Sequence, residues 1–185
     1  LTQKTGKKIS ACLPMHTFGF PVHMDELKKV CDFWKIPIIE DAAESLGSLY
    51  KNQQTGSIGE MGVFSFNGNK IVTAGGGGAI VSHIGKWAMK AKYITNTAKR
   101  PHEYEYFHDE IGYNYRMPNL NAALLTAQLQ NLNQFIENKK ELYEDYRLLS
   151  SAHGLNLIEI PQNQMWNYWL FGITMNSREE RDLFL

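Results

Sequence analysis

The sequence predicts an α/β fold, a mixed, mostly parallel sheet with flanking helices. Two patterns support this prediction. Short apolar runs that are typical of core strands alternate with helical periodicity. In addition, one strand–helix–strand unit fits within about thirty residues, and the right-handed crossover of such a unit makes its two strands parallel. Because 43% of the 185 residues are hydrophobic, the chain can bury a sizeable core.

The strand–helix–strand unit lies near the start of the chain. Residues 8–14 predict the first strand, and residues 36–41 predict the second. Between them, apolar residues recur at the i, i+3, i+4 and i+7 spacing of one helical face: Leu27, Val30, Cys31 and Trp34. Such sheets bind ligands beyond the carboxyl ends of their strands. Asp41 and the loop that carries His16 are therefore expected at a binding edge.

The later elements follow in order. Apolar runs predict strands at residues 63–66 and 79–82, and helical periodicity predicts a helix at residues 86–94. Residues 95–110 are polar and unperiodic, which is typical of a surface loop. Residues 119–150 predict one long helix, or two helices in line, that bridges two domains.

The domain organisation follows from this bridging helix. We expect residues 1–150 to be part of a large domain, and residues 151–185 to be the start of a small α+β C-terminal domain. Strands at residues 155–158 and 167–175 and a helix capped by Ser177 would open that small domain. The chain begins without Met and ends within a helical pattern, so we expect an incomplete large domain from a longer protein.

Charge and cysteine content exclude several classes of protein. Lys plus Arg and Asp plus Glu number 19 each, and a net charge of zero argues against nucleic-acid or anionic-membrane partners. No apolar run has the length of a membrane span. Cys12 and Cys31 lie in apolar contexts typical of free thiols, which favours a cytoplasmic location. His102 and His108 lack the spacing of metal ligands, so no metal is expected.

One lysine stands between two predicted core strands. Lys70 follows the strand at residues 63–66 and precedes four consecutive glycines, Gly75–Gly78. Two interpretations remain open for Lys70. Its stem is covered while its head stays in water, as is common for lysine, or it is a functional amine. The glycines allow either a loose loop or a close approach of the backbone to a ligand or a neighbouring subunit.

Asp41 is a second candidate residue, and it follows a neighbouring predicted strand. An aspartate at the end of a strand often caps the next turn, which is the simpler interpretation. In one α/β unit, however, Asp41 and Lys70 can meet at the same sheet edge. An ion pair would explain such a meeting, and so would a Schiff-base lysine with a carboxylate for the pyridine nitrogen of pyridoxal phosphate (PLP).

The motifs around these residues resemble one family. Residues 14–19 (PMHTFG), 40–47 (EDAAESLG), 65–70 (SFNGNK) with Gly75–Gly78, and 112–117 (GYNYRM) are similar, in this order, to the DegT/DnrJ/EryC1/StrS aminotransferases. These are PLP-dependent sugar aminotransferases of fold type I, and the resemblance implies that fold for this chain. Within the family, the chain looks most like enzymes that aminate C4 of UDP-linked 4-keto-6-deoxy sugars in the legionaminic acid and bacillosamine pathways.

The resemblance implies roles for five cofactor residues. Lys70 would form the Schiff base with PLP and then serve as the base for proton transfer. Asp41 would keep the pyridine nitrogen protonated, since an opposite charge favours the charged form. Ser65 would bind the cofactor phosphate, and Glu44 would lie beside the ring hydroxyl. Asn114 would reach the cofactor phosphate of the other subunit.

The resemblance also implies a substrate and an assembly. The amino donor would be an amino acid such as glutamate, and the acceptor a nucleotide sugar. Tyr115 and Arg116 are candidates for contacts to its diphosphate, with an ordinary surface loop as the equal alternative. His16 is a further candidate for substrate binding. Two subunits would share each active site, which predicts a homodimer.

The chain departs from the family in one respect. The N-terminal portion that supplies a phosphate loop and an aromatic ring stacked on the cofactor has no counterpart here, so we expect this chain alone to bind PLP poorly. A non-catalytic relative that binds a nucleotide sugar or a partner, with Lys70 merely ion-paired, is the competing hypothesis, as is an inactive fragment. Dehydratases of the family typically carry His at the lysine position, so Lys70 argues against that activity.

Overall fold

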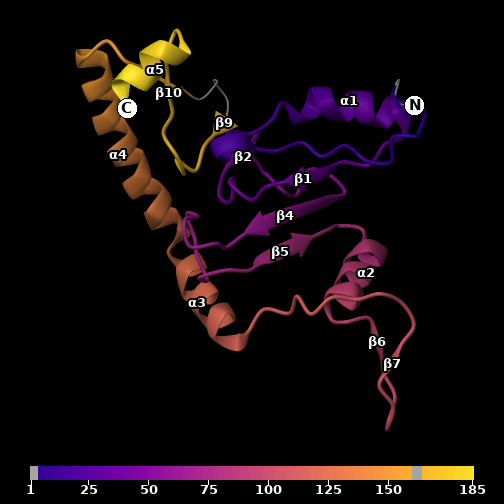
Figure 1. Ribbon diagram of the computed structural model, residues 1–185. Helices are drawn as coiled ribbons and strands as arrows, with labels where there is room; N and C mark the ends of the chain where they lie inside the picture. Colours follow the sequence, from indigo (N-terminus) through magenta and orange to yellow (C-terminus); the bar gives the residue numbers. More distant parts are fainter. Residues whose placement is uncertain (1–3, 160–163) are drawn as a thin grey trace.

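A small mixed sheet forms the centre of the protein. The computed structural model describes residues 4–159 and 164–185, so the first three residues of the predicted large-domain portion lie outside the described residues (Figure 1). The sheet has the order β1 (Ile39–Asp41), β4 (Met61–Ser65) and β5 (Gly78–Val81). β1 and β4 are parallel, and β5 is antiparallel to β4. The mixed α/β architecture expected from the sequence is therefore confirmed.

The predicted first strand, at residues 8–14, is reduced to isolated pairings beside β1. Cys12 and Met15 each form one parallel bridge there. Between these bridges, the carbonyl of Pro14 accepts a hydrogen bond from the N–H of Asp41 at 2.8 Å. Proline has no N–H to donate in return, so the ladder is interrupted at Pro14. The segment still extends the sheet in the parallel direction.

Helices flank the sheet and lead away from it. α1 (Met24–Trp34) lies next to β1, and α2 (Gly85–Thr95) lies next to β5 (Figure 1). α3 (Asn119–Gln130) and α4 (Leu132–Ala152) follow each other in line, with a break at Asn131 (Figure 1). The long helical pattern therefore forms two helices, the second of the two predicted alternatives.

The apolar face predicted for α1 is only partly buried. Cys31 is buried, but Val30 and Trp34 are exposed by 57% and 64%. Met24, at the start of the helix, is buried instead. The helix thus packs on the sheet by a narrower stripe than its periodicity indicates.

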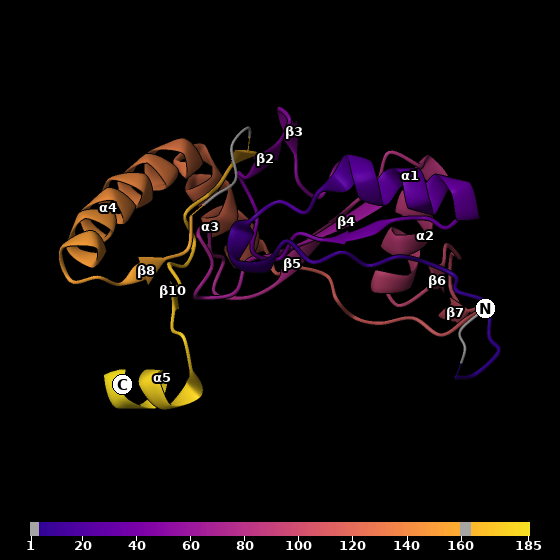
Figure 2. The ribbon, with the colours of Figure 1, turned by 90° about the horizontal axis from the view of Figure 1, so that it is seen from above.

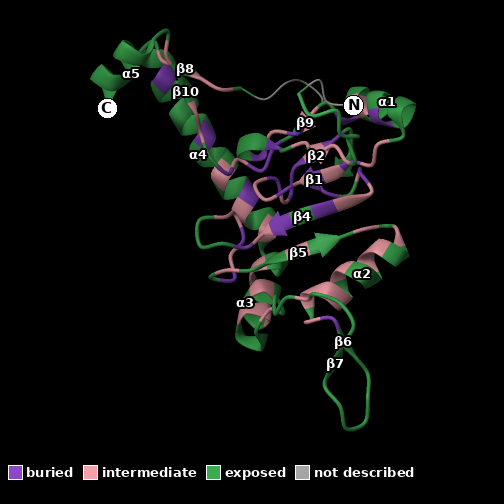
Figure 3. Cartoon of the chain, turned by 45° about the vertical axis from the view of Figure 1, so that its right-hand side comes forward, coloured by how far each residue is buried: buried purple, intermediate pink, exposed green. Residues whose placement is uncertain are grey.

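Short elements complete the fold. They are η1 (Thr17–Gly19), β2 (Leu49–Tyr50), β3 (Gln53–Gln54), β6 (Lys99–Arg100), β7 (Phe107–His108), β8 (Asn156–Leu157), β9 (Gln164–Met165), β10 (Ile173–Thr174) and α5 (Arg178–Phe184). β2 pairs with both β3 and β9, so the chain returns to the first half of the molecule after α4. β6 and β7 form a hairpin inside the predicted surface loop, and this hairpin is exposed (Figure 3).

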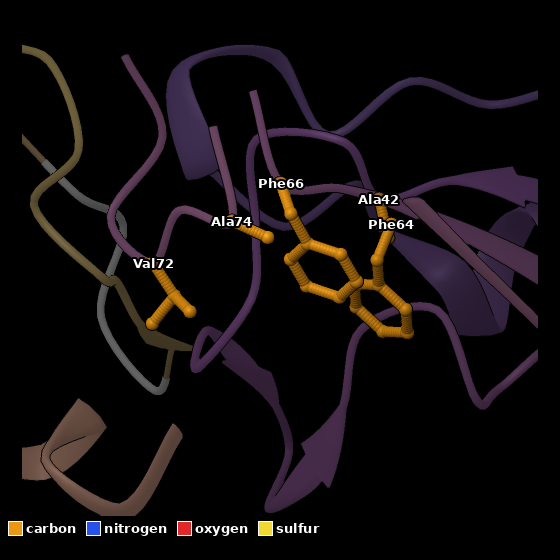
Figure 4. Close-up of a cluster of buried hydrophobic side chains, with 5 residues drawn as sticks. All are labelled: Ala42, Phe64, Phe66, Val72 and Ala74. Carbon is orange, nitrogen blue, oxygen red and sulfur yellow. The ribbon is translucent and has the colours of Figure 1, made fainter. Parts of the chain in front are cut away.

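A buried apolar cluster supports the segment between β4 and β5. It consists of Ala42, Phe64, Phe66, Val72 and Ala74 (Figure 4). Burying each large apolar side chain contributes about 1.5–3 kcal/mol. The N–H of Phe66 donates to the Gly77 carbonyl at 2.9 Å, and the N–H of Ala74 donates to the Phe66 carbonyl at 3.0 Å. Lys70 therefore lies on a loop that is anchored on both sides.

The C-terminal part contains β8, β10 and α5 near the far end of α4 (Figure 2). Ser177 caps α5 as predicted, because its hydroxyl accepts a hydrogen bond from the N–H of Glu180 at 3.1 Å. The division into a large and a small domain remains a prediction. None of the helices in the described ranges combines the length and the apolar character that crossing a membrane requires.

Candidate active site

The side chain of Lys70 is largely shielded from solvent. Only 13% of it is exposed, and its Nζ lies 3.8 Å from Oε1 of Glu44. The same nitrogen lies 4.2 Å from the centroid of the Trp169 ring. A lysine that snorkels keeps its ammonium in water, so this geometry favours a functional amine over a simple surface lysine.

The carboxylate that faces Lys70 is held in place by a backbone N–H group. Oε2 of Glu44 accepts a hydrogen bond from the N–H of Phe18 at 2.7 Å. Phe18 has a φ of +56°, which is uncommon for a residue other than glycine. The other oxygen, Oε1, is the one that points toward Lys70. Glu44 therefore offers Lys70 one oriented oxygen at a distance longer than a direct hydrogen bond.

Asp41 and Ser65 lie on one face of the sheet. Asp41 pairs with Val63 in the parallel ladder, and Ser65 is two residues beyond Val63 on the same strand. Because side chains alternate along a strand, these three share a face at the carboxyl ends of β1 and β4. Oδ1 of Asp41 accepts a hydrogen bond from the N–H of Ala43 at 3.1 Å. Within residues 4–159 and 164–185, the structure gives Oδ2 no hydrogen-bond partner.

Asn114, Tyr115 and Arg116 lie together on a cavity of about 900 Å³. Val63, the glycines at 76–78 and α2 form its other walls. Of the described residues, Lys70 and Glu44 are not among those that line it.

His16 is placed differently from the expectation. Its side chain is fully buried, and its Nε2 lies 2.9 Å from Oε2 of Glu40. Its Nδ1 accepts a hydrogen bond from the N–H of Val22 at 3.0 Å, so Nε2 carries the hydrogen and donates it to Glu40. Both ring nitrogens are thus occupied within the protein, which argues against the substrate contact expected for His16.

Glu40 is the centre of this buried group. Besides His16, its carboxylate accepts hydrogen bonds from the N–H groups of Gly56, Ile58 and Gly59 at 2.6–2.8 Å. Burial raises the pKa of the carboxyl, but the hydrogen bonds from His16 and from the backbone of Gly59 and Gly56 outweigh it. The pKa of Glu40 therefore lies below its ordinary value.

Trp169 and Asn167 are site residues that the sequence did not reveal. The indole N–H of Trp169 donates to the Asn69 carbonyl at 2.7 Å, directly before Lys70. Asn167 is fully buried and donates to the carbonyls of Glu44 and Leu46 at 2.8 and 3.0 Å. In the sequence, these two residues stand in an aromatic-rich run that predicts a strand. Their partners lie 100 or more positions earlier in the chain, so no local pattern reveals the contacts.

These residues fit PLP. A shielded lysine amine suits a bond to the cofactor aldehyde, and an open carboxylate oxygen on Asp41 suits a protonated ring nitrogen. The hydroxyl of Ser65 lies on the same sheet face as Asp41, and among the described residues its one hydrogen-bond contact is from the N–H of Asn67 at 3.4 Å. Ser65 can therefore accept or donate a hydrogen bond to a phosphate.

Comparison with known proteins identifies the family. Residues 1–185 match the family model described as the DegT/DnrJ/EryC1/StrS aminotransferase family. The chain belongs to this family. The resemblance found in its motifs is thereby confirmed, and with it the PLP dependence that this family implies.

Three curated relatives match nearly the whole chain. EpsN of Bacillus subtilis, named as a pyridoxal phosphate-dependent aminotransferase, is 36% identical over 95% of this chain and 45% of its own length. GDP-perosamine synthase of Escherichia coli O157:H7 is 32% identical over 98% and 50%. A UDP-4-amino-4,6-dideoxy-N-acetyl-beta-L-altrosamine transaminase of Campylobacter jejuni is 33% identical over 93% and 46%. The chain thus spans about half the length of the curated relatives it matches.

Solved structures agree on the fold. The aminotransferase TlmJ of Streptoalloteichus hindustanus superposes with a TM-score of 0.87 at 24% identity, over 94% of this chain and 48% of that one. DesV of Streptomyces venezuelae superposes with a TM-score of 0.82 at 29% identity, over 92% of this chain and 46% of that one. The predicted fold-type-I architecture is confirmed for the half of such a chain that is present.

Proposed function

We propose that this chain carries the lysine half of a nucleotide-sugar aminotransferase site. The observation that supports this most directly is the shielded Lys70 amine, which lies 3.8 Å from a fixed carboxylate oxygen. When bound, PLP supplies an aldehyde for the lysine and a ring that withdraws electrons from the reacting carbon. The residues of this chain bind and orient that group and move protons next to it.

Lys70 and Glu44 act on protons in this proposal. Lys70 would hold the cofactor through its amine, and the amine, when free, would serve as the base for proton transfer. Glu44 would lie beside the ring hydroxyl, as the family position implies, and would orient the amine through Oε1. The low exposure of both side chains supports the role, because it keeps bulk water from competing for the proton.

Asp41 and Ser65 hold the cofactor. Oδ2 of Asp41 would accept the hydrogen of the ring nitrogen and keep that nitrogen positively charged. Ser65 would donate its hydroxyl hydrogen to the phosphate from the same sheet face. Their common face at the carboxyl ends of β1 and β4 supports this assignment.

Asn114, Tyr115 and Arg116 serve the site of a second subunit. Each subunit would complete the other's site in a homodimer, as the resemblance to the family implies. Asn114 would contact the cofactor phosphate there. Arg116 and Tyr115 would contact the diphosphate of the nucleotide sugar, since the guanidinium suits phosphate geometry.

The acceptor is a nucleotide-linked 4-keto-6-deoxy sugar that is aminated at C4, with glutamate as the amino donor. UDP is the proposed nucleotide, and the names of the relatives include both UDP- and GDP-sugar enzymes. The two free cysteines support the cytoplasmic location that this proposal includes.

Absorbance spectroscopy tests the lysine assignment. A full-length protein that contains this chain should form a yellow, borohydride-reducible band with PLP, and Lys70→Ala should abolish it. Lys70→Arg is the matched control. It keeps the positive charge but cannot bond to the aldehyde, so it should lack the band as well. An unchanged, reducible band in both variants would contradict the proposal.

Product analysis tests the substrate assignment. With glutamate present, mass spectrometry should detect a C4 amine on the UDP-linked 4-keto-6-deoxy sugar in preference to the GDP-linked one. Faster turnover of the GDP-linked sugar would overturn the nucleotide assignment alone. Amination of neither sugar by a protein that binds PLP would overturn the substrate class.

A further inference from the structure

The buried amide of Asn167 holds the turn that carries Glu44. The side chain of Asn167 is fully buried, and its Nδ2 donates hydrogen bonds to the carbonyls of Glu44 and Leu46 at 2.8 and 3.0 Å. Among the described residues, Asn167 is the only hydrogen-bond partner of the Glu44 carbonyl. The two contacts join positions that are 123 and 121 residues apart, so the place of this turn depends on a segment near the other end of the chain.

Other hydrogen bonds fix Asn167 itself. Its Oδ1 accepts a hydrogen bond from the N–H of Trp169 at 3.1 Å, and its backbone N–H donates to Oγ of Ser48 at 3.0 Å. Two carbonyl oxygens face one end of the amide and one N–H group faces the other end, so the amide has a single orientation that satisfies all three.

Gly19 encloses the same amide. It has a φ of +86°, and a Cβ atom on Gly19 would lie 2.2 Å from Oδ1 of Asn167 and 3.0 Å from the carbonyl oxygen of Glu44. Only glycine therefore fits at this position. The carbonyl of Gly19 also accepts a hydrogen bond from the hydroxyl of Ser48 at 2.7 Å. Asn167 is thus packed so closely that its amide and the Glu44 backbone cannot move independently.

The backbone of Glu44 determines where its carboxylate lies. Oε2 accepts a hydrogen bond from the N–H of Phe18 at 2.7 Å, and Oε1 lies 3.8 Å from Nζ of Lys70. The side chains of Glu44 and Lys70 are only 15% and 13% exposed. Both oxygens belong to one carboxylate, so a shift of the turn that breaks the contact with Phe18 also changes the distance to Lys70.

We propose that Asn167 is a positioning residue for the proposed reaction and that it acts through Glu44. Its amide holds the turn in the place from which Oε1 faces the Lys70 amine. This inference rests on the proposed function, in which Glu44 orients that amine. A displacement of about 1 Å at a reacting group can lower a rate by about 100-fold, so a hydrogen bond remote from the chemistry can control it.

Hydrogen exchange at the N–H of Phe18 tests the position of Glu44 in the full-length protein without cofactor. Exchange of this N–H should speed up when its carboxylate acceptor moves away. The N–H of Ala98, which donates to the carbonyl of Tyr93 at 2.9 Å, gives the reference rate. Asn167→Asp keeps the size and the acceptor oxygen but loses the NH₂ donors, and it should raise the ratio of the two rates about tenfold. Asn167→Ala removes the whole amide and should raise the ratio as well.

Two further variants show whether the effect passes through Glu44. Cys31→Ala changes a buried side chain of α1 outside these contacts, and it should leave the exchange ratio within about twofold of the wild type. Glu44→Ala removes the acceptor and should raise the ratio by itself. In the Glu44→Ala background, Asn167→Asp should add less than about twofold, because residues that act through one contact are not additive.

Steady-state kinetics test the consequence for the reaction. With PLP, glutamate and the UDP-linked 4-keto-6-deoxy sugar, Asn167→Asp should lower kcat of the full-length protein about tenfold and leave KM for the sugar within about twofold. Most of this loss should disappear in the Glu44→Ala background. A residue that is merely structural would lower the active fraction by the same factor in both backgrounds.

The outcomes distinguish this inference from the proposed function. An unchanged exchange ratio in both Asn167 variants, or additive effects of Asn167 and Glu44, would overturn the positioning role and leave the proposed function intact. Failure of both Asn167 variants to fold, measured as lost protection at Ala98, would also overturn it and make Asn167 a structural residue. A kcat that Glu44→Ala leaves unchanged would overturn it together with the proposed role of Glu44. If the wild type transferred no amino group while the exchange results held, the proposed function would fail and Asn167 would hold Glu44 without a role in the reaction.

Discussion

Glu40 and Glu44 are four positions apart, and the structure surrounds them in opposite ways. Glu40 is fully buried and accepts hydrogen bonds from His16 and three backbone N–H groups. Glu44 accepts one backbone hydrogen bond and faces Lys70 with its second oxygen at 3.8 Å. Both oxygens of the Glu40 carboxylate accept hydrogen bonds. Only one oxygen of Glu44 accepts a hydrogen bond from a described residue, and the other faces the Lys70 amine.

This difference separates a structural carboxylate from a chemical one. A saturated, buried carboxylate stabilises the fold because its removal leaves several donors without partners. A carboxylate at ion-pair distance from a lysine contributes little to stability, because a contact longer than a hydrogen bond is weak. The two residues therefore predict opposite responses to substitution.

The largest effect is expected for the buried carboxylate. Glu40→Ala should lower the free energy of unfolding by about 3–5 kcal/mol, since it leaves His16 and three N–H groups buried without an acceptor. Glu44→Ala is the matched control and should cost less, about 1–2 kcal/mol, because it removes one backbone hydrogen bond and one contact longer than a hydrogen bond. Denaturant unfolding of both variants measures the contrast, and equal losses would show that the comparison is wrong.

A smaller effect is expected from acid. Because the folded-state pKa of Glu40 lies below the ordinary value of 4.5, the ionised form favours the folded state above that pH. This contribution is lost as the pH falls below 4.5 through the lower folded-state pKa. The wild-type midpoint of thermal unfolding should therefore drop between pH 7 and about pH 3.5 more steeply than that of Glu40→Gln. Parallel curves for the two proteins would exclude Glu40 as a source of acid sensitivity.

The smallest effect on stability is expected at the lysine. Lys70→Met keeps the apolar stem and removes the ammonium, so the free energy of unfolding should change by at most about 1 kcal/mol. Denaturant unfolding measures this as well. A loss above about 2 kcal/mol would mean that the ion pair with Glu44 is structural, which would favour the non-catalytic hypothesis for this chain.

The elements that periodicity predicted well are those with a strong local signal. The helices α1, α2 and α5 and the strands β4 and β5 appear close to their expected positions. The strand at residues 8–14 was overestimated, because a single proline interrupts its hydrogen bonds. The expected surface loop at residues 95–110 contains the β6–β7 hairpin, whose short strands have no apolar alternation to reveal them.

The site was predicted unevenly for a similar reason. Lys70, Asp41 and Ser65 stand in short motifs next to strands, so their arrangement follows from the order of the chain. For His16, the sequence could not reveal a buried partner, because Glu40 lies 24 positions away and its environment depends on a third segment, at Gly56–Gly59.

By itself, the sequence determined the family and the α/β class, because contiguous motifs and local periodicity carry that information. It also led to the proposal that Lys70 is the lysine to which a cofactor would bond. Only the tertiary structure decided that the carboxylate of Glu40 is buried among hydrogen-bond donors and that the carboxylate of Glu44 faces Lys70. It also placed the ring of Trp169 next to the Lys70 amine and joined the indole N–H to the carbonyl of Asn69, 100 positions earlier in the chain. The physical reason is that burial and hydrogen-bond saturation depend on segments that meet only after the chain has folded.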